Sequence, residues 1–351
     1  MLRMSDIAAK AGVSASTVSF VLNDRHEAVR ISESTRQRVL QAANEMGYRV
    51  NHQARAMRTS NTRTIGIVGG DLCAELVGCM LSGILEEVDR QDYTLKILPA
   101  QGDEGQRQMI RRASELRLMG VIGLHLSPQM VAEFHAEAQS CKYPLVLLDT
   151  HDTVAKVLQV VSDDDGGVAA VISHLTGLGH KRIAMISGVG NSTLTLLREA
   201  AYEREMACYG LPVPKGFLAR GDFDDLAPSA QAVRGLLMLP PAERPTALFC
   251  AGDRIALAAL QVAQQMELEV PRYLSVVGFS DYSAAEFAAP ALTTVQQPFR
   301  DMGRLAVRRL LQASADEKCL PCDGEFISSR RGVLELLPTR FITRQTTGPA
   351  P

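Results

Sequence analysis

The sequence lacks any long uninterrupted hydrophobic run. No stretch of its 351 residues approaches the roughly 18 consecutive apolar residues that a helix needs to cross a membrane. The first residues, MLRMSDIAAKAG, contain no apolar core of the kind that a secretory signal carries. The sequence therefore predicts neither a membrane span nor export, and we expect a cytoplasmic protein.

Cysteine is sparse and odd in number, which disfavours a disulfide framework and fits reduced thiols. The seven cysteines are Cys73, Cys79, Cys141, Cys208, Cys250, Cys319 and Cys322. The last two form a CLPC motif with the spacing of a redox or zinc site. Because the sequence offers no second cysteine pair and no nearby histidine to complete four ligands, we expect a surface loop there, no metal and no cofactor.

An excess of charge of one sign is also missing overall, but the charges are unevenly distributed. The formal net charge is −2, with 37 Lys and Arg against 39 Asp and Glu. Residues 1–63 hold 10 of the basic and 5 of the acidic residues, which leaves 27 and 34 for the remainder. A basic head on an acidic body is expected where only the head contacts a polyanion, although a chance bias of surface residues would give the same numbers.

The head is predicted to consist of three short helices. Ser5 is expected to cap the first helix, with Asp6 in its first turn and Gly12 at its end. Ser14 is expected to cap a second helix that runs to about Asn23.

The third helix follows from the segment SESTRQRVLQAANEM, which Ser32 caps and Gly47 closes. Its apolar face is predicted to contain Val39, Leu40, Ala43 and Met46.

The second helix has an unusual exposed face. Its apolar residues Val18, Val21 and Leu22 should pack against the first helix at Ile7, Ala8 and Ala11. The opposite face carries small and hydroxyl side chains together with one aromatic ring: Ala15, Ser16, Ser19 and Phe20. Such a face can approach the floor of a DNA groove, while hydroxyls at the helix start reach phosphate oxygens. The residues alone fit an ordinary helical hairpin equally well.

From residue 64 onward, short apolar strands alternate with amphipathic helices. The predicted strands are TIGIVG, YTLKIL, GVIGLHL, PLVLLD, VLQVVS, RIAMIS, TALFCA and LSVVGF. This alternation predicts parallel sheets covered on both faces, arranged as two doubly wound, Rossmann-like subdomains with a ligand crevice at the carboxyl ends of the strands. The segment NHQARAMRTSNTR reads as a linker, and the final TTGPAP is expected to be disordered.

Several motifs, in order along the whole chain, resemble the lactose/galactose repressor family of bacterial transcription regulators. They are MSDIAAKAGVSASTVSFVLN, ISESTRQRVLQAANEMGYRVN, ARAMRTSNTRTIGIV, LGHKRIAMISG and VVGFSDY followed by LTTVQQP. The resemblance implies an all-α helix-turn-helix head, a hinge helix and an α/β core shaped like periplasmic sugar-binding proteins. The implied divisions are a head at 1–48, a hinge at 49–63, a first core subdomain at 64–162 and 293–324, and a second at 163–292 and 325–351.

The resemblance also implies which residues contact DNA. They are Ser5, Ser14, Ala15, Ser16, Thr17, Ser19, Phe20, Asn23, Arg55, Met57 and Arg58. Phe20 stands where the family commonly has arginine, so it either touches a thymine methyl group or packs inward. Met57 takes the place of a leucine that wedges between base steps in the minor groove.

In the core, the resemblance implies an effector site formed by Asp71, Ser127, Asp149, Arg198, Phe223, Gly252, Asp253, Ser280 and Asp281. Gly252 replaces the family's asparagine and Ser280 replaces an aspartate, so the usual sugar pose loses two partners. Arg198, Arg254 and His125 could instead favour an acidic or phosphorylated effector. Asp253 and Asp281 are equally well explained as helix-cap or turn residues.

The resulting expectation is a carbohydrate-responsive transcriptional repressor that binds a pseudo-palindromic DNA operator as a homodimer, possibly as a tetramer, and that a small effector controls. No pair of nucleophile and base suggests an enzyme, and GVGNST lacks the third glycine of a dinucleotide-binding motif. The alternative is a cytosolic solute-binding or enzymatic α/β protein whose head has no function.

Overall fold

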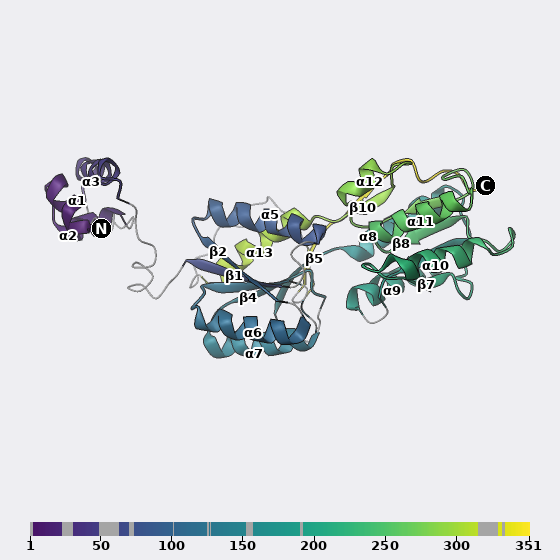
Figure 1. The fold of residues 1–351 in the computed structure, drawn as a ribbon, viewed down its shortest axis with the longest axis horizontal. Coiled ribbons are helices and arrows are strands. Elements are labelled where there is room, and N and C mark those ends of the chain that lie inside the picture. The colour runs from purple at the N-terminus through teal and green to yellow at the C-terminus, as the bar shows by residue number, and fades with distance from the viewer. Residues whose placement is uncertain are drawn as a thin grey trace. The chain divides into compact units, whose positions relative to one another are not determined.

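The computed structural model of the chain divides into two compact units, Met1–Thr62 and Arg63–Pro351 (Figure 1). It describes residues 3–22, 31–48, 63–69, 74–100, 102–124, 126, 128–151, 157–189, 192–314, 329–331 and 334–351. Residues 49–62 of the predicted hinge, 49–63, and the CLPC motif lie outside the described residues. No helix in the described part of the chain is both long and apolar enough to span a bilayer.

The first unit contains the three predicted helices, α1 (Met4–Ala11), α2 (Ala15–Leu22) and α3 (Glu33–Glu45). Their shared core includes Ile7, Val18 and Val39, none of which is exposed. Gly12 ends α1 with φ of 65°, in the left-handed region that glycine adopts without strain. The prediction of three helices in a compact head is confirmed.

Two details of the head differ from the sequence prediction. Helix α1 begins two residues earlier than expected, so its cap is Arg3 and not Ser5; Ser5 is exposed within the first turn. On α3, Leu40 is 38% exposed, and Ala42 is buried in its place. Ala42 lies three residues after Val39 and therefore shares its face of the helix, whereas Leu40 is rotated by about 100°.

The second unit contains two lobes, each built on a parallel sheet with helices on both faces. In the first lobe the strand order is β11-β12-β5-β4-β3-β1-β2. The strands are β1 (Thr64–Gly69), β2 (Thr94–Pro99), β3 (Gly120–Leu124), β4 (Leu145–Leu148), β5 (Leu158–Ser162), β11 (Ser329–Arg331) and β12 (Leu334–Leu337). All neighbours are parallel except β11 and β12, which pair antiparallel.

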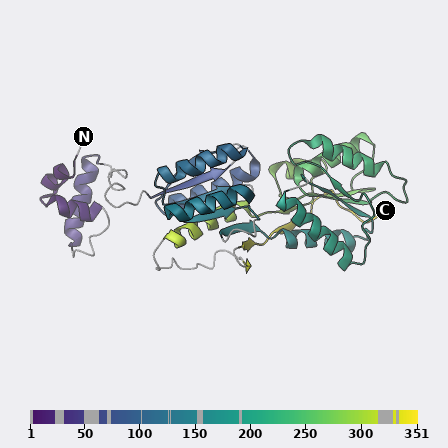
Figure 2. The same ribbon diagram turned by 90° about the horizontal axis from the view of Figure 1, so that it is seen from below.

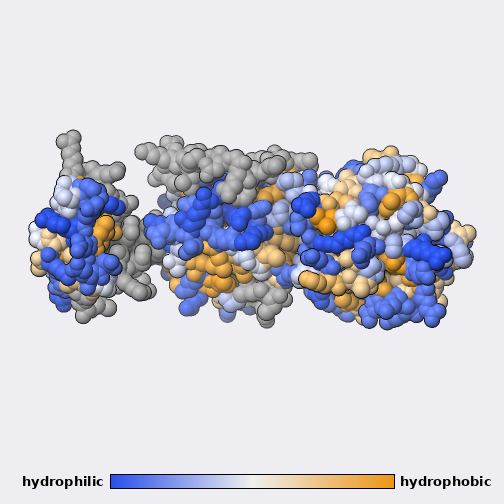
Figure 3. Space-filling model, turned by 90° about the horizontal axis from the view of Figure 1, so that it is seen from above, coloured by the Kyte–Doolittle hydropathy of each residue, from blue (hydrophilic) through white to orange (hydrophobic). Residues whose placement is uncertain are grey.

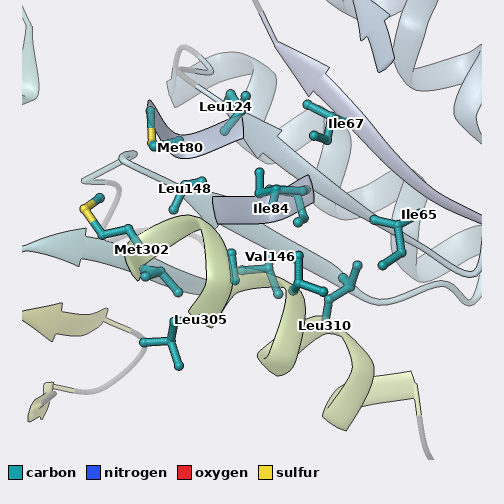
Figure 4. Packing of buried hydrophobic residues seen from close by; sticks show 14 of the residues in the cluster. Ile65, Ile67, Met80, Ile84, Leu124, Val146, Leu148, Met302, Leu305 and Leu310 are labelled. Atoms are coloured by element: carbon teal, nitrogen blue, oxygen red, sulfur yellow. The ribbon is translucent and has the colours of Figure 1, made fainter. Parts of the chain in front are cut away.

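Four helices cover the sheet of the first lobe. Helices α5 (Glu75–Arg90) and α13 (Phe299–Ser314) lie on one face, and α6 (Gly102–Glu115) and α7 (Pro128–Cys141) lie on the other (Figure 1). Figure 4 shows the first of these cores, where Met80 and Ile84 of α5 and Leu305 of α13 converge with strand residues. All three side chains are almost completely buried.

The second lobe has the strand order β7-β6-β8-β9, with all strands parallel. Its strands are β6 (Ile183–Ser187), β7 (Leu218–Arg220), β8 (Ala247–Cys250) and β9 (Ser275–Val277). Helices α8 (Asp164–Gly177) and α9 (Thr193–Cys208) cover one face, while α10 (Leu226–Leu237) and α11 (Asp253–Gln265) cover the other. A short helix α12 (Ser283–Phe287) and the antiparallel pair β10 (Thr294–Gln296) and β13 (Arg340–Ile342) complete the lobe.

The chain passes between the lobes three times (Figure 2): after β5, after β10 and after β12. The predicted boundaries at 293 and 325 differ from this arrangement. Strand β10 pairs with β13 in the second lobe, and strands β11 and β12 join the sheet of the first lobe. The sequence prediction failed here because these strands are three or four residues long and carry little periodicity of their own.

The carboxyl-terminal residues are ordered, which corrects the expectation of a disordered tail. The backbone N–H of Val276 in β9 donates to the carbonyl of Thr346 at 2.8 Å, and the Thr346 hydroxyl donates to the carbonyl of Val276 at 2.6 Å. The buried His180 ring contacts the carbonyl oxygen of Gly348 at 3.0 Å. The tail thus covers β9, the edge strand of the second sheet.

Candidate functional site

The start of helix α2 brings several hydroxyl groups together. The backbone N–H of Thr17 donates to Ser14 Oγ at 3.0 Å, so Ser14 caps the helix as predicted. The hydroxyls of Ser14 and Thr17 lie 2.8 Å apart, and Ser16 Oγ lies 3.2 Å from Ser14 Oγ. Ala15 and Ser16 are exposed. The helix therefore presents a small, polar amino-terminal end to solvent, as the sequence suggested.

Phe20 lies on the same helix and is half-buried. The described side chains that pack on the head core include Val13 and Leu22 from this region, and Phe20 is not among them. Ser19 is also half-buried.

Several predicted site residues lie outside the described residues. They are Asn23, Arg55, Met57, Arg58, Asp71 and Ser127, together with His125.

Arg198 is held within the protein by three contacts. Its Nε donates to Asp164 Oδ2 at 2.9 Å, its Nη1 donates to the carbonyl of Ala251 at 2.6 Å, and its guanidinium carbon lies 4.0 Å from the centre of the Phe279 ring. The whole residue is 2% exposed. Because the Arg198 guanidinium lies on an aromatic ring and in a buried ion pair, its position is fixed by the protein itself.

A chain of hydrogen bonds continues from this ion pair toward the place where the lobes join. Ser162 Oγ, at the end of β5, donates to Asp164 Oδ1 at 2.7 Å and accepts from Gln297 Nε2 at 2.7 Å. Ser280 Oγ donates to Gln297 Oε1 at 3.1 Å. Because Ser162 and Gln297 stand at two of the three crossings, this network links the crossings to the Arg198 pair.

Phe223 lies across two glycines at the carboxyl ends of strands β6 and β8. A Cβ atom built on Gly188 would overlap the Phe223 ring, and one built on Gly252 would meet it at 3.2 Å. The predicted site residue Gly252 therefore offers no side chain to a ligand, and the ring occupies the space in front of it.

Asp253 is completely buried at the start of helix α11. Its Oδ1 accepts a hydrogen bond from the Thr294 hydroxyl at 2.5 Å, and its Oδ2 accepts one from the backbone N–H of Tyr282 at 2.7 Å. Burial raises the pKa of Asp253 to about 6, with a smaller rise from the nearby Asp281 carboxylate. These contacts give Asp253 a structural role, which was the alternative reading of this residue.

The remaining predicted residues also have internal partners. Asp281 Oδ1 accepts from Arg344 Nη2 at 2.7 Å, and its other oxygen accepts from Gln296 Nε2 at 2.9 Å. Arg254 pairs with Asp224 at 3.1 Å. Asp149 is 9% exposed and follows strand β4 with φ of 53°. The structure therefore brings Arg198, Asp253, Ser280 and Asp281 into one connected region. There their side chains form hydrogen bonds and ion pairs with other groups of the protein.

Sequence reasoning missed Asp164 and Gln297, which organise this region. Asp164 lies in the run SDDDGG directly after a predicted strand, and Gln297 lies in the QQP motif quoted for the family. These positions, after a predicted strand and within a family motif, were the sequence signals that could have identified the two residues.

Two surface hollows lie elsewhere on the second lobe. One of about 490 Å³ is lined by residues of β7, among them Arg220, by residues of α10 and by Lys215, which precedes β7. Another of about 500 Å³ lies between α11 and Pro290. Figure 3 shows that hydrophilic and hydrophobic residues alternate over the visible face of this lobe.

Comparison with known proteins agrees with both parts of the structure. The model of the family described as bacterial regulatory proteins, lacI family, matches residues 3–51, and that of the periplasmic binding protein-like domain matches residues 172–347. The HTH-type transcriptional repressor PurR of Aliivibrio fischeri (strain MJ11) is 30% identical over 320 residues, which cover 90% of this chain and 93% of that protein. PurR of Vibrio campbellii is 30% identical over 332 residues, with 91% and 93% covered.

Solved structures show the same similarity. The crystal structure of the Lac repressor dimer bound to operator and the anti-inducer ONPF has a TM-score of 0.80 and 26% identity, and the match covers 99% of each chain. The transcriptional regulator CelR in complex with cellobiose has a TM-score of 0.70 and 25% identity, covering 99% of this chain and 100% of that one.

A helix-turn-helix head joined to a periplasmic-binding-protein-like core defines a ligand-controlled DNA-binding regulator. The chain belongs to the lacI family of bacterial regulatory proteins. It is a transcriptional repressor whose DNA binding is controlled by a small molecule, and the expected fold class is confirmed.

Proposed function

We propose that the chain binds a pseudo-palindromic operator as a homodimer, and that a small metabolite bound between the lobes of its core sets the operator affinity. The exposed hydroxyl-bearing end of helix α2 carries this proposal, because a capped helix start with small side chains fits a major groove and its phosphates. A two-fold dimer would place two such helices about one helical turn apart on DNA.

The proposed base contacts come from Ala15, Ser16 and Phe20. Because the Ser14 and Thr17 hydroxyls lie 2.8 Å apart, we assign this pair to the phosphate backbone, with Ser5 and Ser19 beside them. Phe20 would recognise a thymine methyl group, since a phenyl ring cannot form the bidentate guanine contact of an arginine.

From the sequence, Asn23 would extend the base-reading end of the second helix, and Met57 would wedge into the minor groove between Arg55 and Arg58. A short hinge helix is marginal by itself, so its folding would depend on how the cores of the dimer are held. An effector shifts this equilibrium only by binding one core arrangement more tightly.

For the effector, we propose a neutral metabolite such as a sugar or a related compound. Arg198 and Arg254 are paired with Asp164 and Asp224, which argues against an acidic effector held by these two cations. Phe223 offers an aromatic ring for stacking against a flat or apolar face. Asp71, Ser127, Asp149, Ser280 and Asp281 remain the candidate polar contacts. We propose a cytoplasmic, non-enzymatic role.

The decisive experiment selects operators from a random DNA pool with the purified chain and measures mobility shifts on the selected sequence. We expect an inverted repeat, and an affinity whose logarithm falls linearly with the logarithm of salt concentration. Ser16→Ala should weaken specific binding several-fold while leaving binding to unrelated DNA unchanged.

A matched control is Ser173→Ala, which alters a serine on helix α8 of the core. It should leave operator affinity unchanged. If no sequence is enriched at low salt, or if Ser16→Ala and Ser173→Ala behave alike, the proposed reading of DNA by α2 is wrong.

A further inference from the structure

Tyr282 belongs to the second lobe but packs on the first. It follows strand β9 and directly precedes helix α12. Its ring stacks on Phe299, the first residue of α13, with ring centres 6.5 Å apart and an angle of 23° between the planes. The side chain also packs against the hydrophobic core between α5, α13 and the first sheet. Tyr282 therefore bridges the two lobes.

The loop that carries Tyr282 is anchored on both lobes. The Tyr282 backbone N–H donates to Asp253 of the second lobe at 2.7 Å. The next backbone N–H, of Ser283, donates to Glu75 Oε1 at 2.7 Å, and Glu75 begins helix α5 of the first lobe. The position of the tyrosine is therefore set by hydrogen bonds on either side of the lobe junction.

Tyr282 is tied to residues that the family resemblance assigns to the effector site, because it directly follows Ser280 and Asp281 and its backbone N–H donates to Asp253. Burial raises the pKa of Tyr282 to about 12; the Ser280 hydroxyl and the Arg198 guanidinium lower it, and the carboxylates of Asp149 and Asp253 raise it further. All four groups are among the residues that the family resemblance assigns to the effector site.

We infer that Tyr282 is a built-in occupant of the effector site. Its ring and hydroxyl group lie where a ligand with a hydroxylated ring would otherwise bind and connect the two lobes. A flat ring with a polar end is what a ligand site that combines apolar surface with a small number of placed polar groups accepts. The inference rests on the proposed effector site. If Tyr282 occupies the effector site, an effector must displace it in order to bind. While no effector is bound, the tyrosine stabilises one arrangement of the two lobes relative to the other.

The test removes the ring and supplies it again in solution. In the full-length Tyr282→Ala variant we expect a lower melting temperature than in the wild type. Addition of 4-methylphenol, which reproduces the tyrosine side chain, should raise the melting temperature of the variant by about 2 °C or more, because a ligand that binds only the folded state stabilises it. The wild type should show no shift.

Two comparisons sharpen this experiment. Toluene has the same ring without the hydroxyl group and should produce a smaller shift than 4-methylphenol. Tyr209→Ala removes a tyrosine that is 47% exposed at the end of helix α9, and 4-methylphenol should not shift its melting temperature. If Tyr282→Ala does not fold, Tyr282→Val takes its place with the same expected shift.

The inference is overturned if 4-methylphenol shifts the wild type and the variant equally, if it shifts neither, or if toluene is as effective. Operator affinity is a separate measurement, in which Tyr282→Ala should differ from the wild type by at least about threefold, as a shifted equilibrium between lobe arrangements requires. Rescue without any operator binding by the wild type would refute the proposed function alone. Operator binding without rescue would refute the role of Tyr282 alone.

Discussion

Arg198 and Asp164 form an ion pair with an Nε to Oδ2 distance of 2.9 Å, and their side chains are only 3% and 6% exposed. The pair sits beside the chain crossings, with Ser162 and Gln297 bound to the same carboxylate. A residue that the family resemblance assigns to the effector thus also supports the framework around the site. This dual position makes it the first target for mutation.

Arg198→Met should lower the free energy of unfolding of the core by about 3 to 5 kcal/mol, because it leaves the Asp164 carboxylate buried without its counter-charge. Urea denaturation followed by circular dichroism measures the change. The control is Arg204→Met on the same helix, whose pair with Asp165 has side chains 48% and 44% exposed; it should cost less than about 1 kcal/mol. Similar losses in both variants would contradict a special role for the buried pair.

Asp253 should make the core less stable as the pH rises from about 4 to about 6. Burial raises the pKa of its carboxyl group in the folded protein to about 6, from an ordinary value of 3.8. Between these values the folded state keeps a proton that the unfolded state has lost, so this stabilisation is present at low pH and disappears above the folded pKa.

Asp253→Asn removes the titrating group while its amide can still bond Thr294 and the Tyr282 N–H. Urea midpoints of both proteins, taken across this pH range, should show the wild type losing stability relative to the variant as the pH rises. Parallel curves would show that Asp253 does not titrate in this range.

The two serines at the start of helix α2 should separate stability from DNA recognition. Ser14→Ala removes the cap on the Thr17 N–H and should destabilise the head by about 1 kcal/mol. Ser16→Ala changes an exposed side chain and should leave head stability within about 0.5 kcal/mol of the wild type. Amide hydrogen exchange of the head gives both values. An equal effect of the two substitutions would argue against Ser14 as the cap.

Two glycines of helix α5 should respond in opposite directions to alanine. A Cβ atom on Gly83 would overlap the backbone carbonyl of Arg300 in α13, whereas one on Gly78 would meet nothing within 4 Å. Gly83→Ala should therefore cost about 1 to 3 kcal/mol through overpacking. Gly78→Ala should stabilise by about 0.5 to 1 kcal/mol, because alanine has the higher helix propensity. Thermal melts of the two variants give the comparison, and stabilisation by both would mean that α5 and α13 are not in close contact.

Much of the local structure followed from the sequence. All eight apolar runs predicted as strands contain strands. A buried strand of a parallel sheet requires such a run along its whole length, although β2, at the edge of its sheet, is largely exposed. The caps Ser14 and Ser32 and the stop at Gly12 were also predictable, since each acts on backbone groups within a few residues.

The relationships between distant segments were not predictable in this way. The sequence alone does not say that β12 joins the first sheet, that Thr346 bonds to β9, or that Arg198 pairs with Asp164. The sequence also does not say that the Tyr282 ring stacks on Phe299, or that the next residue, Ser283, donates a hydrogen bond to Glu75.

Within this chain, the sequence determined the order of helices and strands, the hydroxyl-bearing face of α2 and the family to which the protein belongs. These depend on side-chain periodicity and on contacts between near neighbours. Only the tertiary structure decided which charges are paired, where the chain crosses between lobes and which ring lies at their junction. Those outcomes depend on packing and hydrogen bonding between residues far apart in the sequence, such as Ser283 and Glu75, which are 208 positions apart, and no local pattern encodes them.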